Sequence, residues 1–182
     1  MAHFCVNCGE PLALKTIEGR DHEYCPKDGF VLWRDPKVAA AVVVEHEGGI
    51  VLGRRAIEPA YGDWCLPGGF VNDDEDPASA AVRECREEIN AAVELTALLG
   101  IYHVAKTAAS SIVGVAYRGR LADGETISAG PEMLEVRVFT PDGLPQIAFP
   151  SHREVLAMHA AAATPASPPS PTPAPPRSPR TR

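Results

Sequence analysis

The sequence predicts an α+β fold in which helices cover a mixed β-sheet. It contains several short apolar runs of strand length and an amphipathic segment with clear helix start and end signals. These strand and helix segments follow one another without strict alternation, which favours a mixed sheet over a wholly parallel one. Hydrophobic residues make up 45% of the 182 residues, enough to build one core.

The strands are predicted from apolar runs between turn residues. Val38–Glu45 reads VAAAVVVE, as expected for a buried strand, and the polar, glycine-containing residues 46–49 lead into a second strand at Ile50–Arg54. Further strands are expected near Val93–Val104, Ile112–Tyr117 and Leu134–Phe139, with a last helix over His152–Ala162.

A helix is predicted between Asp76 and Asn90. The Asp76 side chain can cap the helix, and Pro77 is favoured at the first helical position. Asn90 can adopt the left-handed conformation that ends a helix. We expect an apolar stripe at helical spacing to face the sheet, formed by Ala78, Val82, Cys85 and Ile89.

The same helix carries a cluster of carboxylates, Glu84, Glu87 and Glu88. Like charges at this spacing repel one another, so the cluster requires a counter-charge. Arg83 can supply part of it, and a divalent cation can supply more. Carboxylate oxygens suit Mg²⁺ or Mn²⁺. The alternative is an ordinary solvated helix face, which the glycine loop before the helix and the placement of Glu75 disfavour.

The segment from residue 69 to 91 resembles the signature of the Nudix hydrolases. That signature reads Gly, five residues, Glu, seven residues, Arg-Glu, an apolar residue, any residue, Glu-Glu, any residue, Gly and an apolar residue. The corresponding positions here are Gly69, Glu75, Arg83, Glu84, Cys85, Glu87, Glu88, Asn90 and Ala91. Every charged position matches, whereas Asn90 stands where the family has glycine and Cys85 takes an apolar position. The preceding Trp64 and LPGG also match the family's usual lead-in.

The resemblance covers most of residues 36–158 and implies the Nudix fold, an α/β/α sandwich with a mixed sheet. It implies a hydrolase that cleaves a phosphoanhydride bond with Mg²⁺ or Mn²⁺. The metal ligands would be Glu84, Glu87 and Glu88, with the Gly69 carbonyl as a further ligand. Glu75 would lie near the metal water or hold Arg83, and Arg83 would orient the carboxylates. Glu84 is the first candidate for the catalytic base, and Glu132 is the second.

Residues 1–34 carry a second candidate metal site. The sequences Cys5-Val-Asn-Cys8 and Cys25-Pro-Lys-Asp28 resemble the two knuckles of a zinc ribbon with aspartate at the fourth position. His22 or His3 could replace Asp28, and a ribbon without metal is a third alternative. A bound Zn²⁺ would be structural. Residues 35–162 form the expected Nudix domain, and the Pro/Ala/Ser-rich residues 163–182 are expected to form a disordered tail.

The composition disfavours several classes of partner and location. The formal net charge of −7 disfavours nucleic acid and anionic membranes. No apolar run approaches the roughly 20 residues of a membrane span, and the N-terminus lacks the apolar segment of a secretory signal. Five cysteines, with two in a C-x-x-C pair, favour metal binding in the reducing cytoplasm over disulfides. Cys65 is expected to be a packing residue rather than a nucleophile.

A ribbon ahead of the Nudix signature is similar to ADP-ribose and FAD pyrophosphatases. The similar stretches are Asp35–Lys37, Arg55–Gly69, Gly130–Glu132 and Leu144–Phe149. NADH pyrophosphatases carry an SQPWPFPxS array that residues 92–110 lack. The expected partner is a small nucleotide contacted by Arg54, Arg55, Tyr61, Trp64, Phe70 and Glu132, and a homodimer is possible. The alternatives are hydrolysis of NADH, an oxidised nucleoside triphosphate, a dinucleoside polyphosphate or capped RNA, and a non-catalytic nucleotide-sensing module.

Overall fold

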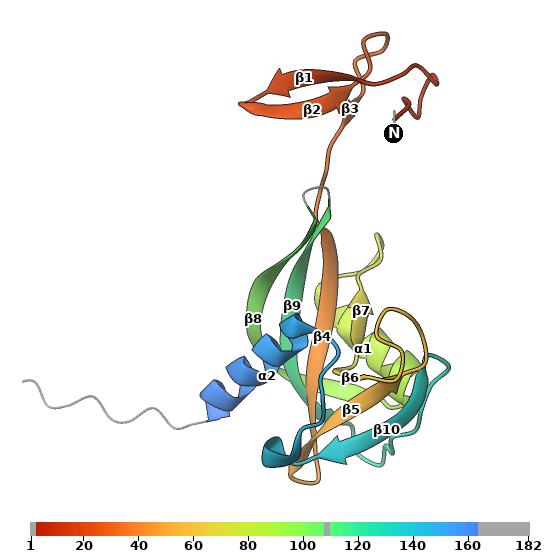
Figure 1. Ribbon diagram of the computed structural model, residues 1–182. Coiled ribbons are helices and arrows are strands. Elements are labelled where there is room, and N and C mark those ends of the chain that lie inside the picture. The colour runs from red at the N-terminus through yellow and green to blue at the C-terminus, as the bar shows by residue number, and fades with distance from the viewer. Residues whose placement is uncertain (1–2, 108–109, 164–182) are drawn as a thin grey trace, which may run out of the picture.

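The computed structural model of the chain describes residues 3–107 and 110–163 (Figure 1). The tail expected over residues 163–182 lies outside the described residues, apart from Ala163. None of the described helices is long and apolar enough to cross a membrane.

Residues 13–32 contain a small antiparallel sheet in the order β1-β2-β3. Its strands are β1 (Ala13–Ile17), β2 (Arg20–Tyr24) and β3 (Val31–Leu32). Figure 1 shows this sheet at the top of the molecule, joined to the larger body by an extended segment. The sequence predicted the cysteine-bearing turns of this region but not these strands, because their residues are largely exposed and lack an apolar face.

The larger body is built on a mixed seven-stranded sheet, as predicted. Its main path has the order β10-β5-β4-β9-β8, with β6 paired to β5 and β7 paired to β4. Only the β4–β9 pair is parallel. The strands are β4 (Lys37–His46), β5 (Gly49–Arg55), β6 (Trp64–Cys65), β7 (Gly68–Phe70), β8 (Val93–Thr107), β9 (Ser110–Leu121) and β10 (Met133–Phe139).

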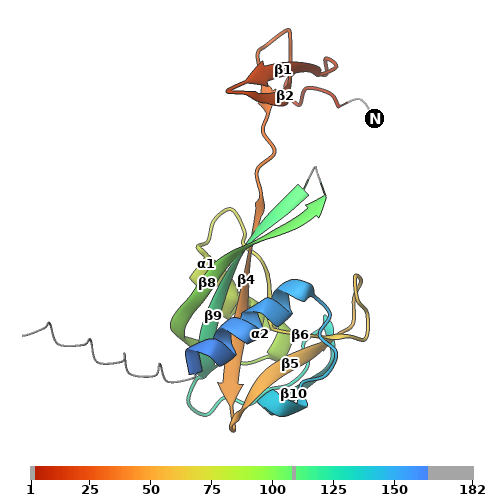
Figure 2. The same cartoon turned by 60° about the vertical axis from the view of Figure 1, so that its left-hand side comes forward.

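Helices cover both faces of this sheet and complete an α/β/α sandwich. The helix α1 (Pro77–Ile89) lies on one face and α2 (Pro150–Ala163) on the other, with a short 3₁₀ helix η1 (Pro141–Gly143) between β10 and α2 (Figure 2). Alternation along β4 supplies both cores: Val42 and Val44 pack with α1, whereas Val43 packs with α2. The fold prediction is therefore confirmed.

The boundaries of α1 agree with the sequence, but its buried face differs from the predicted stripe. Asp76 caps the helix and Asn90 ends it in the left-handed conformation, with φ of 50°. The buried residues are Ala80, Ala81, Cys85, Glu88 and Ile89, whereas Ala78 and Val82 are only partly buried. The small alanines face the sheet most closely, and this shift brings the carboxylate of Glu88 into the interior.

We predict that Asp76→Ala lowers the free energy of unfolding by about 1 kcal/mol. The Asp76 Oδ1 atom accepts hydrogen bonds from the Ala78 and Ser79 amides at 2.8 and 2.9 Å. These bonds lower the pKa of Asp76. Its contribution is therefore present above the unfolded-state pKa and is lost as the pH falls through the folded-state value. Urea denaturation at pH 7 and pH 3 would measure both effects. The exposed Asp74→Ala is the control, and an equal loss in both variants would contradict the assignment.

Candidate active site

The glycine loop brings β7 into close contact with the first glutamate of the helix cluster. Gly68 and Gly69 pair with Ala41 and Ala40 of β4. A Cβ atom on Gly69 would lie 2.5–2.7 Å from the carboxylate atoms of Glu84. Only glycine therefore lets the Glu84 carboxylate lie against this strand.

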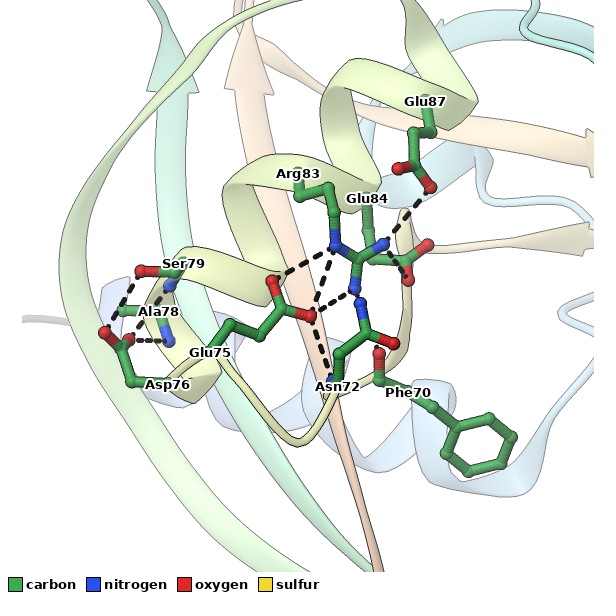
Figure 3. Close-up of polar contacts among 9 residues, drawn as sticks. All are labelled: Phe70, Asn72, Glu75, Asp76, Ala78, Ser79, Arg83, Glu84 and Glu87. Atoms are coloured by element: carbon green, nitrogen blue, oxygen red, sulfur yellow. Dashed lines mark hydrogen bonds and ion pairs between the residues drawn. The ribbon is translucent and has the colours of Figure 1, made fainter.

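Arg83 joins three of the four signature glutamates (Figure 3). Its Nη2 lies 2.6 Å from Glu75 Oε1, and its Nη1 lies 2.8 Å from Glu84 Oε1 and 3.1 Å from Glu87 Oε2. Nη2 also donates to the Phe70 carbonyl at 3.1 Å. The guanidinium thus bridges these carboxylates and the glycine loop.

Glu75 belongs to this network as a partner of Arg83. Arg83 and the backbone N–H of Asn72, 3.0 Å from Glu75 Oε1, lower the pKa of the Glu75 carboxyl. Glu75 is therefore an ionised anchor for Arg83 near neutral pH. Of the two roles predicted for it, these contacts favour holding Arg83.

Glu88 is the buried member of the cluster, with 5% of its surface exposed. Its Oε2 accepts a hydrogen bond from the Gly68 amide at 2.8 Å. Burial raises the pKa of Glu88 to about 8, although this N–H and the charge of Arg55 act in the opposite direction. Burial likewise raises the pKa of Glu84, and the charges of Glu87 and Glu132 add to that shift. Both groups are costly as carboxylates without a nearby cation.

The loop before β10 carries Glu132 to the same place. Gly130 lies so close to the end of α1 that a Cβ atom there would be 1.8 Å from the Glu87 carbonyl oxygen. Its amide donates to the Glu88 carbonyl at 2.9 Å. This close approach positions Glu132, whose charge raises the pKa of both Glu84 and Glu88.

A cavity of about 770 Å³ opens beside the carboxylates. One part of its wall is acidic, with Glu84, Glu87, Glu88 and Glu132. The remainder is mostly apolar and comes from β4, β8, β9, the loop after β5 and the start of α2. The combination of an acidic wall and an apolar chamber suits a ligand with one charged, metal-binding part and one largely apolar part.

The predicted substrate contacts separate into two groups. Arg55, Phe70 and Glu132 line the cavity, whereas Arg54, Tyr61 and Trp64 do not. Arg54 donates from Nε to the Gly62 carbonyl at 2.9 Å, and Tyr61 is 59% exposed. Trp64 packs edge-on against Phe139 at 4.7 Å between ring centroids. Cys65 is buried, and burial raises its thiol pKa to about 12, in agreement with a packing residue.

Sequence reasoning missed several cavity residues that come from distant segments. The most polar of these is His152 on the first turn of α2, and aromatic residues Tyr102 and Phe149 contribute rings. The only sequence signal was the apolar pattern of β8 and of the segment before α2, which identifies secondary structure and not a shared cavity. The close approach of Gly114 to Tyr102, where a Cβ atom would lie 2.2 Å from the ring, likewise depends on strand register.

The residues present fit a divalent cation. Five carboxylates, those of Glu75, Glu84, Glu87, Glu88 and Glu132, gather around only two arginines, Arg55 and Arg83. Burial is the main cause of the raised pKa values of Glu84 and Glu88, and the charges of neighbouring glutamates add to it, so a bound cation would stabilise both carboxylates. Arg83 already bonds Glu84 and Glu87, so a cation would compete with it for those oxygens.

A second candidate metal centre lies in the N-terminal sheet. One ligand atom from each of Cys5, Cys8, Cys25 and Asp28 lies within 4.8 Å of the others. The Cys8 and Cys25 sulfurs are 3.6 Å apart, and the Cys5 sulfur is 3.3 Å from Asp28 Oδ2. A tetrahedral ion with bonds of about 2.3 Å to sulfur needs sulfurs about 3.8 Å apart, so the cluster is of the right size.

The two knuckles have the same backbone pattern, which places Asp28 where a fourth cysteine would stand. The amide of Gly9 donates to the Cys5 carbonyl, and the amide of Gly29 donates to the Cys25 carbonyl. The Phe30 amide lowers the pKa of Asp28 to about 2, so it is ionised. The alternative histidines are engaged elsewhere: His3 bonds Glu23 at 2.7 Å, and His22 packs on Trp33.

Comparison with known proteins identifies the family. The profile described as "NUDIX domain" matches residues 35–158. An "ADP-ribose pyrophosphatase" of Methanocaldococcus jannaschii is 29% identical over 155 residues, covering 84% of this chain and 88% of the relative. The "Low-salt glycan biosynthesis protein Agl8" of Haloferax volcanii is 32% identical over 114 residues, covering 58% and 72%. The crystal structure of a NUDIX hydrolase from Nitrosomonas europaea matches with a TM-score of 0.76 and 33% identity, covering 87% of this chain and 92% of that chain.

We predict that protein without added divalent cation loses stability as the pH rises from about 5 to about 8. The pKa of Glu88 rises from 4.5 in the unfolded chain to about 8 in the folded protein. In that interval the folded state binds a proton that the unfolded state lacks, so the free energy of unfolding falls with increasing pH. Glu88→Gln removes this titration and should flatten that part of the profile.

Urea denaturation at intervals between pH 5 and pH 9 would measure the slope, with the exposed Glu58→Gln as the control. Mg²⁺ should oppose the loss, because it requires the carboxylate form. Identical slopes for the wild type and Glu88→Gln would contradict the assignment.

Proposed function

We propose that this chain, which belongs to the Nudix hydrolase family, cleaves the diphosphate of a nucleoside diphosphate derivative, with ADP-ribose or FAD favoured. The observation that carries the proposal is the acidic wall of the 770 Å³ cavity, where Glu84, Glu87 and Glu88 lie beside the glycine loop. The apolar part of the same cavity can accept a nucleoside.

The choice of substrate rests on several supports. The relative from M. jannaschii bears the name ADP-ribose pyrophosphatase, and its 155-residue alignment is longer than the stretch from residue 35 to 158. The similarity therefore extends beyond the Nudix domain itself. In this chain, Phe70, Tyr102 and Phe149 line the cavity and offer ring faces or edges to an adenine or a flavin.

Glu84, Glu87, Glu88 and the Gly69 carbonyl would hold the divalent cation. Mg²⁺ or Mn²⁺ bound there would polarise the phosphoryl oxygens and lower the pKa of a bound water. Arg83 would hold the carboxylates of Glu84 and Glu87 in position, and Glu75 would hold the guanidinium of Arg83. The all-oxygen donor set supports Mg²⁺ or Mn²⁺.

Hydrolysis requires a base and a leaving group. The oxygen of a water molecule forms a bond to one phosphorus, and the bond from that phosphorus to the bridging oxygen breaks. The electron pair of that bond remains on the departing phosphate, and the proton of the water passes to a carboxylate. Glu84 is the favoured base because burial raises its pKa towards neutrality, and Glu132 is the second candidate.

We also propose that Cys5, Cys8, Cys25 and Asp28 bind a structural Zn²⁺. The size of the cluster and the matching knuckles support the ligand set. Among the described residues 3–34, only Cys5 and Cys25 are buried, so a bound ion would supply stability that an apolar core does not.

A non-catalytic nucleotide sensor is the main functional rival. A sensor would not need the complete set of signature carboxylates. Here Glu75, Glu84, Glu87 and Glu88 are all present and all bonded within one network or to the glycine loop. That completeness favours catalysis.

We predict that the wild type with Mg²⁺ releases AMP from ADP-ribose or FAD faster than from NADH or dinucleoside polyphosphates. A panel that also contains nucleoside triphosphates and capped RNA, assayed with and without Mg²⁺, would measure the preference. Glu88→Gln should abolish metal-dependent turnover while the fold remains intact, because the amide can still accept the Gly68 hydrogen bond but carries no charge. Near-normal hydrolysis by Glu88→Gln, or no hydrolysis of any compound by the wild type, would contradict the proposal.

For the cysteine cluster, we predict that Asp28→Ala lowers the zinc content of the purified protein and that Asp28→Cys restores or raises it. Thiolate binds Zn²⁺ at least as well as carboxylate, whereas alanine offers no ligand. Elemental analysis after dialysis would measure zinc per chain, with the exposed Asp35→Ala as the control. A zinc-free wild type, or full zinc in Asp28→Ala, would refute the ligand set.

A further inference from the structure

The wall of the cavity also contains a cationic group that forms no ion pair with a carboxylate in the described residues, although its charge acts on Glu88. Arg55, at the end of β5, is only 9% exposed and lines the cavity. Its Nε donates to the Pro59 carbonyl at 2.8 Å, and its guanidinium carbon lies 5.0 Å from the centre of the Phe149 ring. No carboxylate forms a salt bridge with it within residues 3–107 and 110–163. Burying a guanidinium without such a partner costs free energy unless an anionic ligand pairs with it.

The first turn of α2 faces the same part of the cavity. Pro150, Ser151 and His152 line it next to Phe149. The start of a helix has a partial positive charge and unpaired backbone N–H groups, and both favour an anion. Here Pro150 has no N–H, and the His152 amide donates to the Phe149 carbonyl at 3.1 Å, so of these three residues Ser151 is the one that can offer a backbone N–H to a ligand. This helix has 14 residues, which is long enough for the helix dipole to place a partial positive charge at its N-terminus.

His152 adds a hydrogen-bond donor with a defined tautomer. Its Nδ1 accepts a hydrogen bond from the Leu66 amide at 3.1 Å. The Nδ1 atom is therefore unprotonated, and Nε2 carries the hydrogen of the neutral ring. Burial, assisted by the charge of Arg55, lowers the pKa of His152 to about 4, so the ring remains neutral at physiological pH. In the described part of the chain, Nε2 has no protein acceptor.

We propose that Arg55, the Nε2–H group of His152 and the first turn of α2 form a subsite for the phosphoryl group that the acidic cluster does not hold. The inference rests on the proposed function, because a diphosphate substrate supplies two phosphoryl groups. One phosphoryl group lies at the carboxylates with the cation, and the other accepts hydrogen bonds from His152 and Arg55. After cleavage, the second group is a phosphomonoester that this subsite retains.

Two substitutions at His152 distinguish the roles of its two ring nitrogen atoms. In His152→Asn, the amide oxygen occupies a place equivalent to Nδ1 and can still accept from the Leu66 amide, but no donor reaches the Nε2 position. In His152→Gln, the longer side chain can place an amide N–H near the Nε2 position. The Asn variant therefore tests the donor while it preserves the contact to Leu66, and the Gln variant tests rescue. The exposed His103→Asn on β8 is the matched control.

The experiment measures binding of AMP and ribose 5-phosphate by calorimetry, without added Mg²⁺ and without a chelator. The wild type and His103→Asn should bind both monoesters. His152→Asn should bind them roughly ten-fold more weakly, as expected for loss of a hydrogen bond to a charged group, and His152→Gln should recover part of the affinity. Thermal denaturation would verify that each variant is folded.

The outcomes distinguish this subsite from the hydrolase proposal. Monoester binding that depends on His152, in a protein that hydrolyses nothing with Mg²⁺, would support the subsite and defeat the proposed function. An active wild type that binds neither monoester, or equal binding by the wild type and a folded His152→Asn, would overturn the subsite. Binding of AMP without ribose 5-phosphate would also overturn it, because the nucleoside and not the phosphate would then be recognised.

Discussion

The ion pairs of Arg83 are the interaction on which the acidic face of this protein depends. Glu75, Glu84 and Glu87 all bond one guanidinium whose side chain is 28% exposed. The side chains of Glu75 and Glu84 are 14% exposed, so solvent screens these two pairs less than it screens surface pairs, whereas Glu87 is an exposed partner. Without Arg83 the carboxylates would repel one another and separate. The same guanidinium also bonds the Phe70 carbonyl and thereby ties α1 to the loop that carries Gly69. The positioning of these carboxylates and the packing of the glycine loop are therefore one structural feature.

Beside this acidic face, the cavity offers charged surfaces for the charged part of a ligand and apolar surfaces for the remainder. β4 lies at the centre of the sheet and supplies both cores, while its residues Ala39, Ala40 and Ala41 leave room for the cavity. The cavity is acidic where α1 and the Gly130 loop meet, and it is cationic or hydrogen-bond-donating where Arg55 meets α2. A diphosphate bound between two such regions would be oriented before any bond is broken, which is how enzymes of this kind reduce the entropic part of the barrier.

Local signals in the sequence were sufficient for the helix, the longer strands and the chemistry of the signature. The Asp76 cap and the left-handed Asn90 directly flank the helix, so their effect can be predicted from neighbouring residues. β6 and β7 have two and three residues and exist only because β5 and β4 pair with them, so no periodicity reveals them. The burial of Glu88 and the convergence of Arg55 with His152 depend on packing between distant segments. Trp64 and Tyr61 were expected to contact the substrate, but Trp64 packs against Phe139 and Tyr61 is exposed, and neither lines the cavity.

The central claim is that the carboxylates of α1 are arranged to receive a divalent cation in place of part of the Arg83 pairing. The most direct measurement is an anomalous difference map from crystals grown with Mn²⁺ and a non-hydrolysable diphosphate analogue. The account predicts a peak at bonding distance from Glu84, Glu87 and Glu88, with Arg83 still paired to Glu75. A map with Mn²⁺ only at the cysteine cluster, or nowhere, and with Glu84 and Glu87 still bonded to Arg83, would contradict it.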